Sequence, residues 1–140
     1  MDGLYYCLEK NEHSTLYLIR FYNESNYVIT KKITGSKIDY IKKELANFKM
    51  EGLSVKGAPE YTFCGAFDES PYSISFKVEN EITDYSEKWV TKDVLTFKGK
   101  INPDGSILCK QTHKRNGYSF DCTYTKTSDE QLIELLLKQI

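Results

Sequence analysis

The chain has 140 residues, which is the size of one domain, and we expect residues 1–140 to form a single domain. Its 19 lysines and arginines nearly balance its 20 aspartates and glutamates. This balance argues against a protein built to bind nucleic acid or an anionic membrane, because such proteins usually carry a basic excess. Hydrophobic residues make up 40% of the chain and aromatic residues 14%, so the sequence has enough apolar surface to fold.

Short segments of alternating apolar and polar residues recur along the chain and are separated by turn residues. Period-two alternation with one apolar face is typical of antiparallel strands that have one side in the core. For example, Ile74, Phe76 and Val78 lie opposite Ser75 and Lys77. The predicted strands are residues 3–10, 15–22, 27–33, 60–67, 72–78, 91–101, 106–112 and 117–126.

The connections between these segments favour antiparallel neighbours. Residues 102–105 read Asn-Pro-Asp-Gly, which is typical of a type I turn. The last connection contains Asn116-Gly117, a common hairpin signal. If residues 114–117 form a four-residue loop, Cys109 faces Cys122. If only Asn116 and Gly117 form the loop, the two cysteines are diagonal neighbours.

Two helices interrupt the strands. The first is predicted from a cap at Ser36 to about Met50, with a stop at Gly52. Its apolar stripe is Ile38, Ile41, Leu45 and Phe48. The second begins at Ser128, and its wide apolar face, which includes Leu132, Leu135 and Leu136, predicts packing on the body of the protein.

Eight successive strands joined mostly by tight turns predict an up-and-down meander, and closing the meander removes both sheet edges. The predicted fold is therefore mainly β: an eight-stranded antiparallel barrel with a helix between strands 3 and 4 and a C-terminal helix on its flank. Odd-numbered turns fall at one end, which would gather His13 and His113 at a mouth covered by the first helix. The interior of such a barrel is either filled by side chains or holds one small ligand.

The sequence resembles small lipocalin-like proteins of the calycin superfamily over most of residues 3–126. The resemblance is carried by Leu18-Ile19-Arg20-Phe21-Tyr22-Asn23-Glu24, Gly57, Tyr61, Ile74-Ser75-Phe76, Leu95, Phe97-Lys98-Gly99-Lys100-Ile101, Ile107-Leu108, Asn116-Gly117-Tyr118 and Tyr124. It implies an eight-stranded barrel with one mouth that binds an apolar ligand. One departure is that the larger secreted lipocalins carry Gly-x-Trp in the first strand, where this chain has Gly3-Leu4-Tyr5.

The candidate ligand-binding residues are mainly aromatic side chains on predicted inward faces. They are Arg20, Tyr22, Tyr61, Phe63, Phe76, Phe97, Phe120 and Tyr124. Arg20 has two readings, because both faces of its strand are apolar. An inward Arg20 would bind a ligand carboxylate through a bidentate bond or pair with a protein acid. An outward Arg20 would lie under the C-terminal helix.

No pattern in the sequence predicts catalysis. It contains no glycine-rich phosphate loop and no Gly-x-Ser-x-Gly elbow. Cys7, Cys64, Cys109 and Cys122 lack metal-ligand spacing and sit in apolar strands, so we expect reduced, buried thiols. The expectation is a protein that is not an enzyme, with no catalytic residue, metal or cofactor.

The function predicted from these observations is the non-enzymatic binding of a small apolar or amphipathic ligand inside the barrel. The alternative is a structural or protein-interaction module whose barrel is filled by side chains. We expect no nucleic-acid partner, and no membrane span, because no apolar run approaches about 20 residues. The first residues do not resemble a signal peptide, which predicts a cytoplasmic location.

Overall fold

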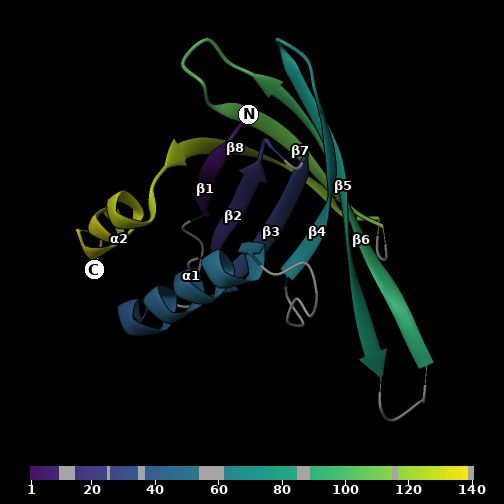
Figure 1. Cartoon of the computed structure of the whole chain (residues 1–140), viewed down its shortest axis with the longest axis horizontal. Helices are drawn as coiled ribbons and strands as arrows, with labels where there is room; N and C mark the ends of the chain where they lie inside the picture. Colours follow the sequence, from purple (N-terminus) through teal and green to yellow (C-terminus); the bar gives the residue numbers. More distant parts are fainter. Residues whose placement is uncertain are drawn as a thin grey trace.

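Eight antiparallel strands close into a barrel in chain order, from β1 to β8 (Figure 1). The computed structural model describes residues 1–9, 15–24, 26–34, 37–53, 62–84, 89–114 and 117–138. The elements are β1 (Gly3–Glu9), β2 (Thr15–Tyr22), β3 (Tyr27–Thr34), α1 (Ile38–Leu53), β4 (Thr62–Glu69), β5 (Ser73–Asp84), β6 (Trp89–Ile101), β7 (Ile107–His113), β8 (Ser119–Thr127) and α2 (Asp129–Leu137). Pairing of β8 with β1, from Leu4↔Thr127 to Tyr6↔Thr125, closes the barrel. The predicted fold class is thereby confirmed.

The β5–β6 hairpin is longer than the sequence predicted. The two strands pair continuously from Ser73↔Lys100 to Asp84↔Trp89, whereas the predicted strands covered only residues 72–78 and 91–101. In Figure 1 both ribbons extend well beyond the neighbouring strands. The β-branched residues in this stretch, such as Ile82 and Val90, favour strands. Along the sequence from Asn80 to Asp84, polar residues stand at both odd and even positions and conceal the alternation.

The interior of the barrel holds one hydrophobic cluster. Its buried members are Tyr5, Ile19, Phe21, Val28, Phe67, Ile74, Phe76, Val78, Phe97, Ile107, Cys109, Cys122 and Tyr124. Within each strand they stand at alternate positions, as the pleat requires. On β2, for instance, the inward residues are Tyr17, Ile19 and Phe21.

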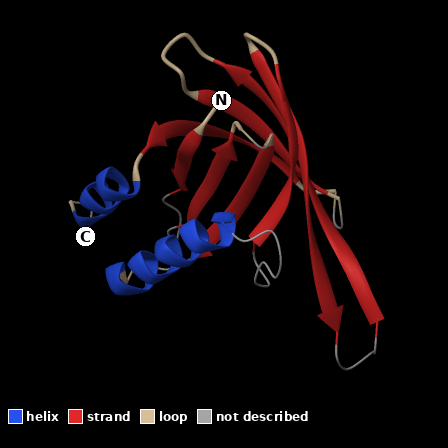
Figure 2. Cartoon of the chain, viewed as in Figure 1, coloured by secondary structure: helices blue, strands red, loops and turns tan. Residues whose placement is uncertain are grey.

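A second cluster lies outside the barrel, between the wall and the two helices. Figure 2 shows the two helices on the same side of the barrel. The wall contributes outward residues of β1, β2 and β3, and the helices contribute apolar stripes. The buried members are Leu4, Leu16, Leu18, Ile29, Ile33, Ile41, Leu45, Phe48, Leu132 and Leu136. Both faces of β2 are thus buried, which explains why its sequence is apolar on both sides. The prediction that the first helix covers the mouth is wrong, because α1 packs on the outer wall beside α2.

The boundaries of the two helices agree in part with those predicted from the sequence. Ser128 caps α2, and its Oγ accepts a hydrogen bond from the backbone N–H of Gln131 at 3.2 Å, as predicted. The predicted stripe of α1 is confirmed, with Ile41, Leu45 and Phe48 buried. The helix does not stop at Gly52 but continues to Leu53. Ser36, the predicted cap of α1, lies outside the described residues.

Two basic side chains project from the wall into this outer layer, and each meets an acid from a helix. Arg20 Nη2 on β2 lies 2.9 Å from Asp129 Oδ1 of α2. Lys31 Nζ on β3 lies 2.9 Å from Glu44 Oε2 of α1. The Arg20 guanidinium also lies 5.6 Å from the centre of the Phe48 ring, within the range of a cation–π contact. Each ion pair therefore ties one helix to the barrel wall.

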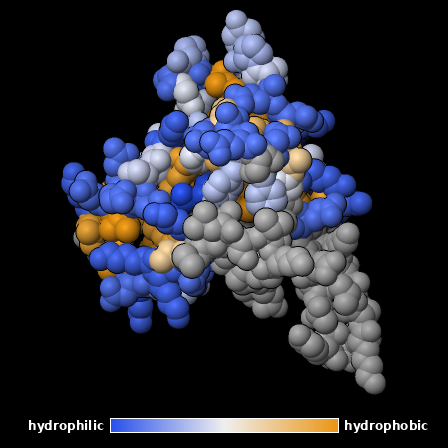
Figure 3. Space-filling model, viewed as in Figure 1, coloured by the Kyte–Doolittle hydropathy of each residue, from blue (hydrophilic) through white to orange (hydrophobic). Residues whose placement is uncertain are grey.

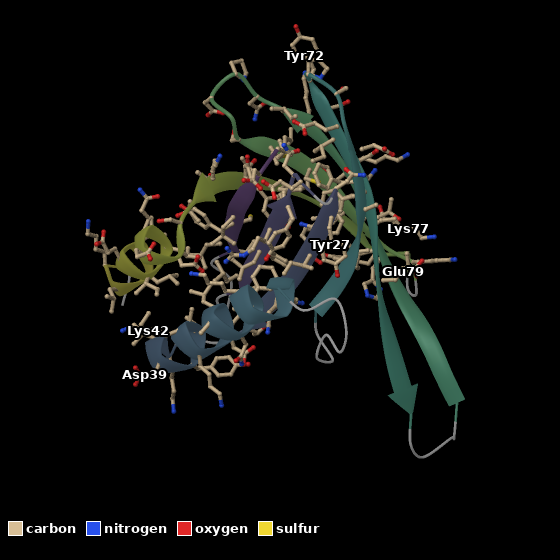
Figure 4. The ribbon with its side chains drawn as sticks, in the orientation of Figure 1. Tyr27, Asp39, Lys42, Tyr72, Lys77 and Glu79 are labelled. Atoms are coloured by element: carbon tan, nitrogen blue, oxygen red, sulfur yellow. The ribbon has the colours of Figure 1, made fainter. Side chains whose placement is uncertain are left out.

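We expect Arg20→Ala to lower the free energy of unfolding by about 2 kcal/mol, because it leaves Asp129 without its partner in a largely buried site. Denaturant titration measures the change. The matched control is Lys77→Ala on β5, whose Nζ lies 3.6 Å from Glu79 with both side chains exposed (Figure 4). Exposed pairs of this kind contribute about 0–1 kcal/mol. Equal losses in the two variants would contradict a structural role for the Arg20 pair.

The face of the molecule seen in Figure 3 is mostly polar where it is coloured, with apolar side chains gathered over α2. Leu137 of this helix is 49% exposed, and Tyr72 in the β4–β5 turn is 78% exposed. Within the described ranges, neither helix has the length and apolar character needed to cross a membrane.

Candidate functional site

Four of the predicted ligand-binding residues do face the barrel interior. They are Phe76, Phe97, Phe120 and Tyr124. Phe76 and Phe97 are register partners on β5 and β6, and their rings stack with centroids 4.5 Å apart. Phe120 lies nearer the other end of the barrel, where its ring centroid is 5.3 Å from that of Tyr17.

Arg20 and Tyr22 lie outside the barrel, and their predicted place in an internal site is corrected. Both belong to the outward face of β2, where Tyr22 packs in the outer cluster and Arg20 pairs with Asp129. The outward reading of Arg20, under the C-terminal helix, is the one the structure supports. Arg20 is therefore not available inside the barrel to bind a ligand carboxylate.

The other two predicted residues are not placed. Tyr61 lies outside the described residues. The backbone of Phe63 in β4 lies opposite Thr30 of β3, but its side chain is not part of the description. His13, which was expected to meet His113 at the mouth, also falls outside it. Within the part of the chain that is described, no three His, Cys, Asp or Glu side chains come together to hold a metal ion.

One end of the interior is packed with aromatic rings. Phe21 makes edge contacts with Tyr5, Phe67 and Phe76, with ring centroids 5.5, 5.1 and 5.6 Å apart. All four side chains are buried. Edge-to-face contacts at these distances are favourable beyond the area that they bury. This end, where β1 starts and β2 ends, is an apolar base.

The opposite half of the interior carries hydrogen-bonding groups that the sequence analysis did not single out. Gln111 Nε2 on β7 donates a hydrogen bond of 2.5 Å to Tyr124 Oη on β8, with both residues buried. The backbone N–H of His113 donates to the carbonyl of Tyr118 at 2.8 Å, and the N–H of Gly117 donates to the carbonyl of His113 at 2.9 Å. Cys109 therefore faces Cys122, which is the first of the two arrangements considered from the sequence.

A thiol pair lies in the same half, on the two strands that close the barrel. Cys7 Sγ on β1 is 2.6 Å from Cys122 Sγ on β8, and Glu9 Oε1 is 3.9 Å from Cys122 Sγ. Cys7, Cys109 and Cys122 are free thiols, in agreement with the expectation of reduced cysteines at these positions. The side chain of Cys64 is outside the description.

Burial keeps the tyrosine hydroxyls and the Cys109 thiol in this half of the interior protonated. It raises the pKa of Tyr17 to about 12, together with the Glu9 carboxylate, and it raises the pKa of Tyr124 well above the ordinary tyrosine value. Burial also raises the pKa of the Cys109 thiol to about 12. At neutral pH these groups are uncharged, so both tyrosines are hydrogen-bond donors.

Side chains in this half keep part of their surface exposed although they face inward. They are Cys7, Tyr17, Leu95 and Phe120. On the same strands, inward residues two positions closer to the apolar base are buried, such as Tyr5 and Ile19. The inward side chains near the end where β1 stops and β2 begins are thus less buried than these, and we call this end the open end.

The two halves together form an amphipathic interior. Strand alternation could have identified Tyr17 and Gln111, since each shares a strand face with core residues. The prediction of which residues face inward failed on β2, because both faces of this strand are apolar. No family model matches this chain, and no curated protein or solved structure matches it either.

Proposed function

We propose that the barrel binds a small apolar or amphipathic ligand through its open end. The observation that carries the proposal is the division of the interior into an apolar aromatic base and a half with buried hydrogen-bonding groups. The apolar part of the ligand would lie against the inward aromatic side chains, such as Phe97 and Phe120. Its polar group would contact the amide of Gln111 and the hydroxyl of Tyr17.

The polar groups available favour a neutral head group over a carboxylate. Arg20 is on the outer wall, and the open end carries the Glu9 carboxylate. Gln111 offers two amide N–H donors and a carbonyl acceptor, of which one donor is used by Tyr124. A long-chain alcohol or amide matches these groups, whereas a carboxylate would approach Glu9 without a partner from Arg20.

We also propose that the barrel is lipocalin-like, in the sense of the calycin superfamily. The closed eight-stranded meander with a C-terminal helix against its wall supports this. The missing Gly-x-Trp motif in β1 separates the chain from the larger secreted members. In this proposal the protein is a binding protein and not an enzyme.

The test is fluorescence titration with the uncharged probe N-phenyl-1-naphthylamine, followed by displacement with an uncharged long-chain alcohol and with the carboxylic acid of equal length. We expect saturable binding at one site and stronger displacement by the alcohol. Gln111→Leu is expected to weaken the binding of the alcohol by about tenfold, the effect of one lost hydrogen bond to a neutral group. Arg20→Ala is the control and should leave this affinity unchanged, because Arg20 lies outside the barrel.

Absence of saturable binding by a protein that still unfolds cooperatively would reject the proposal. The barrel would then be filled by its own side chains, and the structural or protein-interaction module would be the better description.

A further inference from the structure

We propose that Cys7 and Cys122 form a redox-active dithiol that a hydroperoxide converts reversibly into a disulfide between β1 and β8. This inference does not depend on ligand binding. It rests on the position of the two thiols, on the groups that surround them and on the part of the barrel that they join.

The two sulfur atoms are already close to bonding distance. Their separation of 2.6 Å exceeds the length of a disulfide bond, about 2.05 Å, by only about 0.5 Å. The thiols come from the first and last strands, so the crosslink would connect residues 115 positions apart in sequence. Cys109 also faces Cys122, but its thiol donates to the backbone carbonyl of Lys110 at 4.0 Å.

The two thiols are not equivalent. The Cys122 thiol donates a hydrogen bond to the Cys7 sulfur, and the backbone N–H of Thr123 donates another, so the pKa of Cys7 is lowered although burial and Glu9 oppose this. The same contact and burial raise the pKa of Cys122. Cys7 is half-buried, whereas Cys109 and Cys122 are buried. Cys7 is therefore the thiol that a small oxidant meets first as a thiolate.

The location gives the crosslink a structural effect. Register pairing of β1 with β8 runs from Leu4↔Thr127 to Tyr6↔Thr125. Cys7 follows directly after this stretch, and its sulfur accepts the Thr123 N–H. A disulfide here would lock the strand pair that closes the barrel, at the open end of the interior.

The chemistry is a two-electron oxidation in two steps. The Cys7 thiolate attacks a hydroperoxide, the O–O bond breaks, and the departing oxygen takes a proton to leave an alcohol, or water from hydrogen peroxide. Cys7 is then a sulfenic acid. The Cys122 sulfur attacks this sulfur, the S–O bond breaks, and the oxygen leaves as water with the Cys122 proton. Glu9 Oε1, 3.9 Å from Cys122 Sγ, is placed to relay that proton. An external thiol reduces the disulfide and restores both thiols.

The experiment treats the full chain with hydrogen peroxide, alkylates the remaining thiols and maps crosslinked peptides by mass spectrometry. We expect the loss of two thiols and of two hydrogen atoms, one crosslink between the peptides of Cys7 and Cys122, and recovery with dithiothreitol. Cys7→Ser should abolish the crosslink. Cys122→Ser should leave a sulfenic acid on Cys7 that dimedone traps. Cys109→Ala is the matched control and should retain the crosslink.

A second readout is the pH profile of iodoacetamide alkylation at Cys7. In the unmodified protein we expect the apparent pKa to lie below that of an ordinary cysteine, and in Cys122→Ala we expect it to rise, because the hydrogen bond from Cys122 to the Cys7 sulfur is lost. Three results would overturn the proposal: a crosslink between any other pair, two-thiol loss that persists in Cys7→Ser, or oxidation of Cys7 to sulfinic acid without a disulfide.

Discussion

Replacement of Phe21 by alanine should lower the free energy of unfolding by about 3–5 kcal/mol, the range measured for buried phenylalanines. Phe21 is 1% exposed and contacts three other rings of the apolar base. Its removal leaves a cavity where strands from both sides of the barrel meet, and the closed sheet restricts how far the neighbouring rings can move into it. Chemical denaturation monitored by circular dichroism measures the loss.

Tyr72→Ala is the matched control for this prediction. It removes an aromatic side chain of similar size that is 78% exposed, at the tip of the β4–β5 turn (Figure 4). Exposed substitutions of this kind are usually within about 0.5 kcal/mol of neutral. A comparable loss in both variants would mean that the rings around Phe21 do not form a packed base.

Gly65→Ala should destabilise the barrel by about 3 kcal/mol or more, at the upper end of what overpacking causes. A Cβ atom at Gly65 on β4 would lie 2.0 Å from the backbone carbonyl oxygen of Lys77 on β5. The pairing of the two strands joins Cys64 to Glu79 and Phe67 to Phe76, with Gly65 between them. The obstacle is backbone, so relief requires the two strands to separate. Thermal unfolding of the variant measures the effect.

Gly99→Ala is the comparison for Gly65→Ala, because its added Cβ atom would meet side chains and not backbone. A Cβ atom at Gly99 would meet Ile107 Cγ2 at 2.8 Å and Ile74 Cγ2 at 3.0 Å. These are the ends of side chains that can rotate, so we expect a smaller loss than at Gly65. A larger loss at Gly99 would show that the β4–β5 pair adapts more easily than the interior does.

The fold followed from local signals that agree with one another. Alternation on β5 and β8, the turn at residues 102–105 and the cap at Ser128 each specify a short piece of structure, and the meander connects neighbours in the chain. The ends of β5 and β6 were missed because a long hairpin with polar residues on both faces loses its alternation. The position of α1 was missed because a helix that links two strands can pack over the mouth or on the wall, and connection geometry does not distinguish the two.

The interior was predicted less well than the fold. Phe76, Phe97, Phe120 and Tyr124 were identified because their strands have one clearly apolar face. Arg20 was ambiguous because β2 is buried on both sides. Its acid partner lies on α2, and nothing in the sequence links the two residues. The contact between Cys7 and Cys122 depends on closure of the barrel and is not visible in any local pattern.

Closure also has a consequence for how the protein folds. Seven of the eight strand pairings join strands that are neighbours in the chain. The eighth joins β1 to β8, for example Leu4 to Thr127, so it pairs residues from opposite ends of the chain. Hairpins form in about 1–10 μs, but contacts between distant residues must first overcome the entropy of closing a long loop. We therefore expect the docking of β8 on β1 to limit the folding rate. Until that step, the open edge of β1 is a surface on which a second unfinished chain can pair, so the time before closure is when this protein is most prone to aggregate.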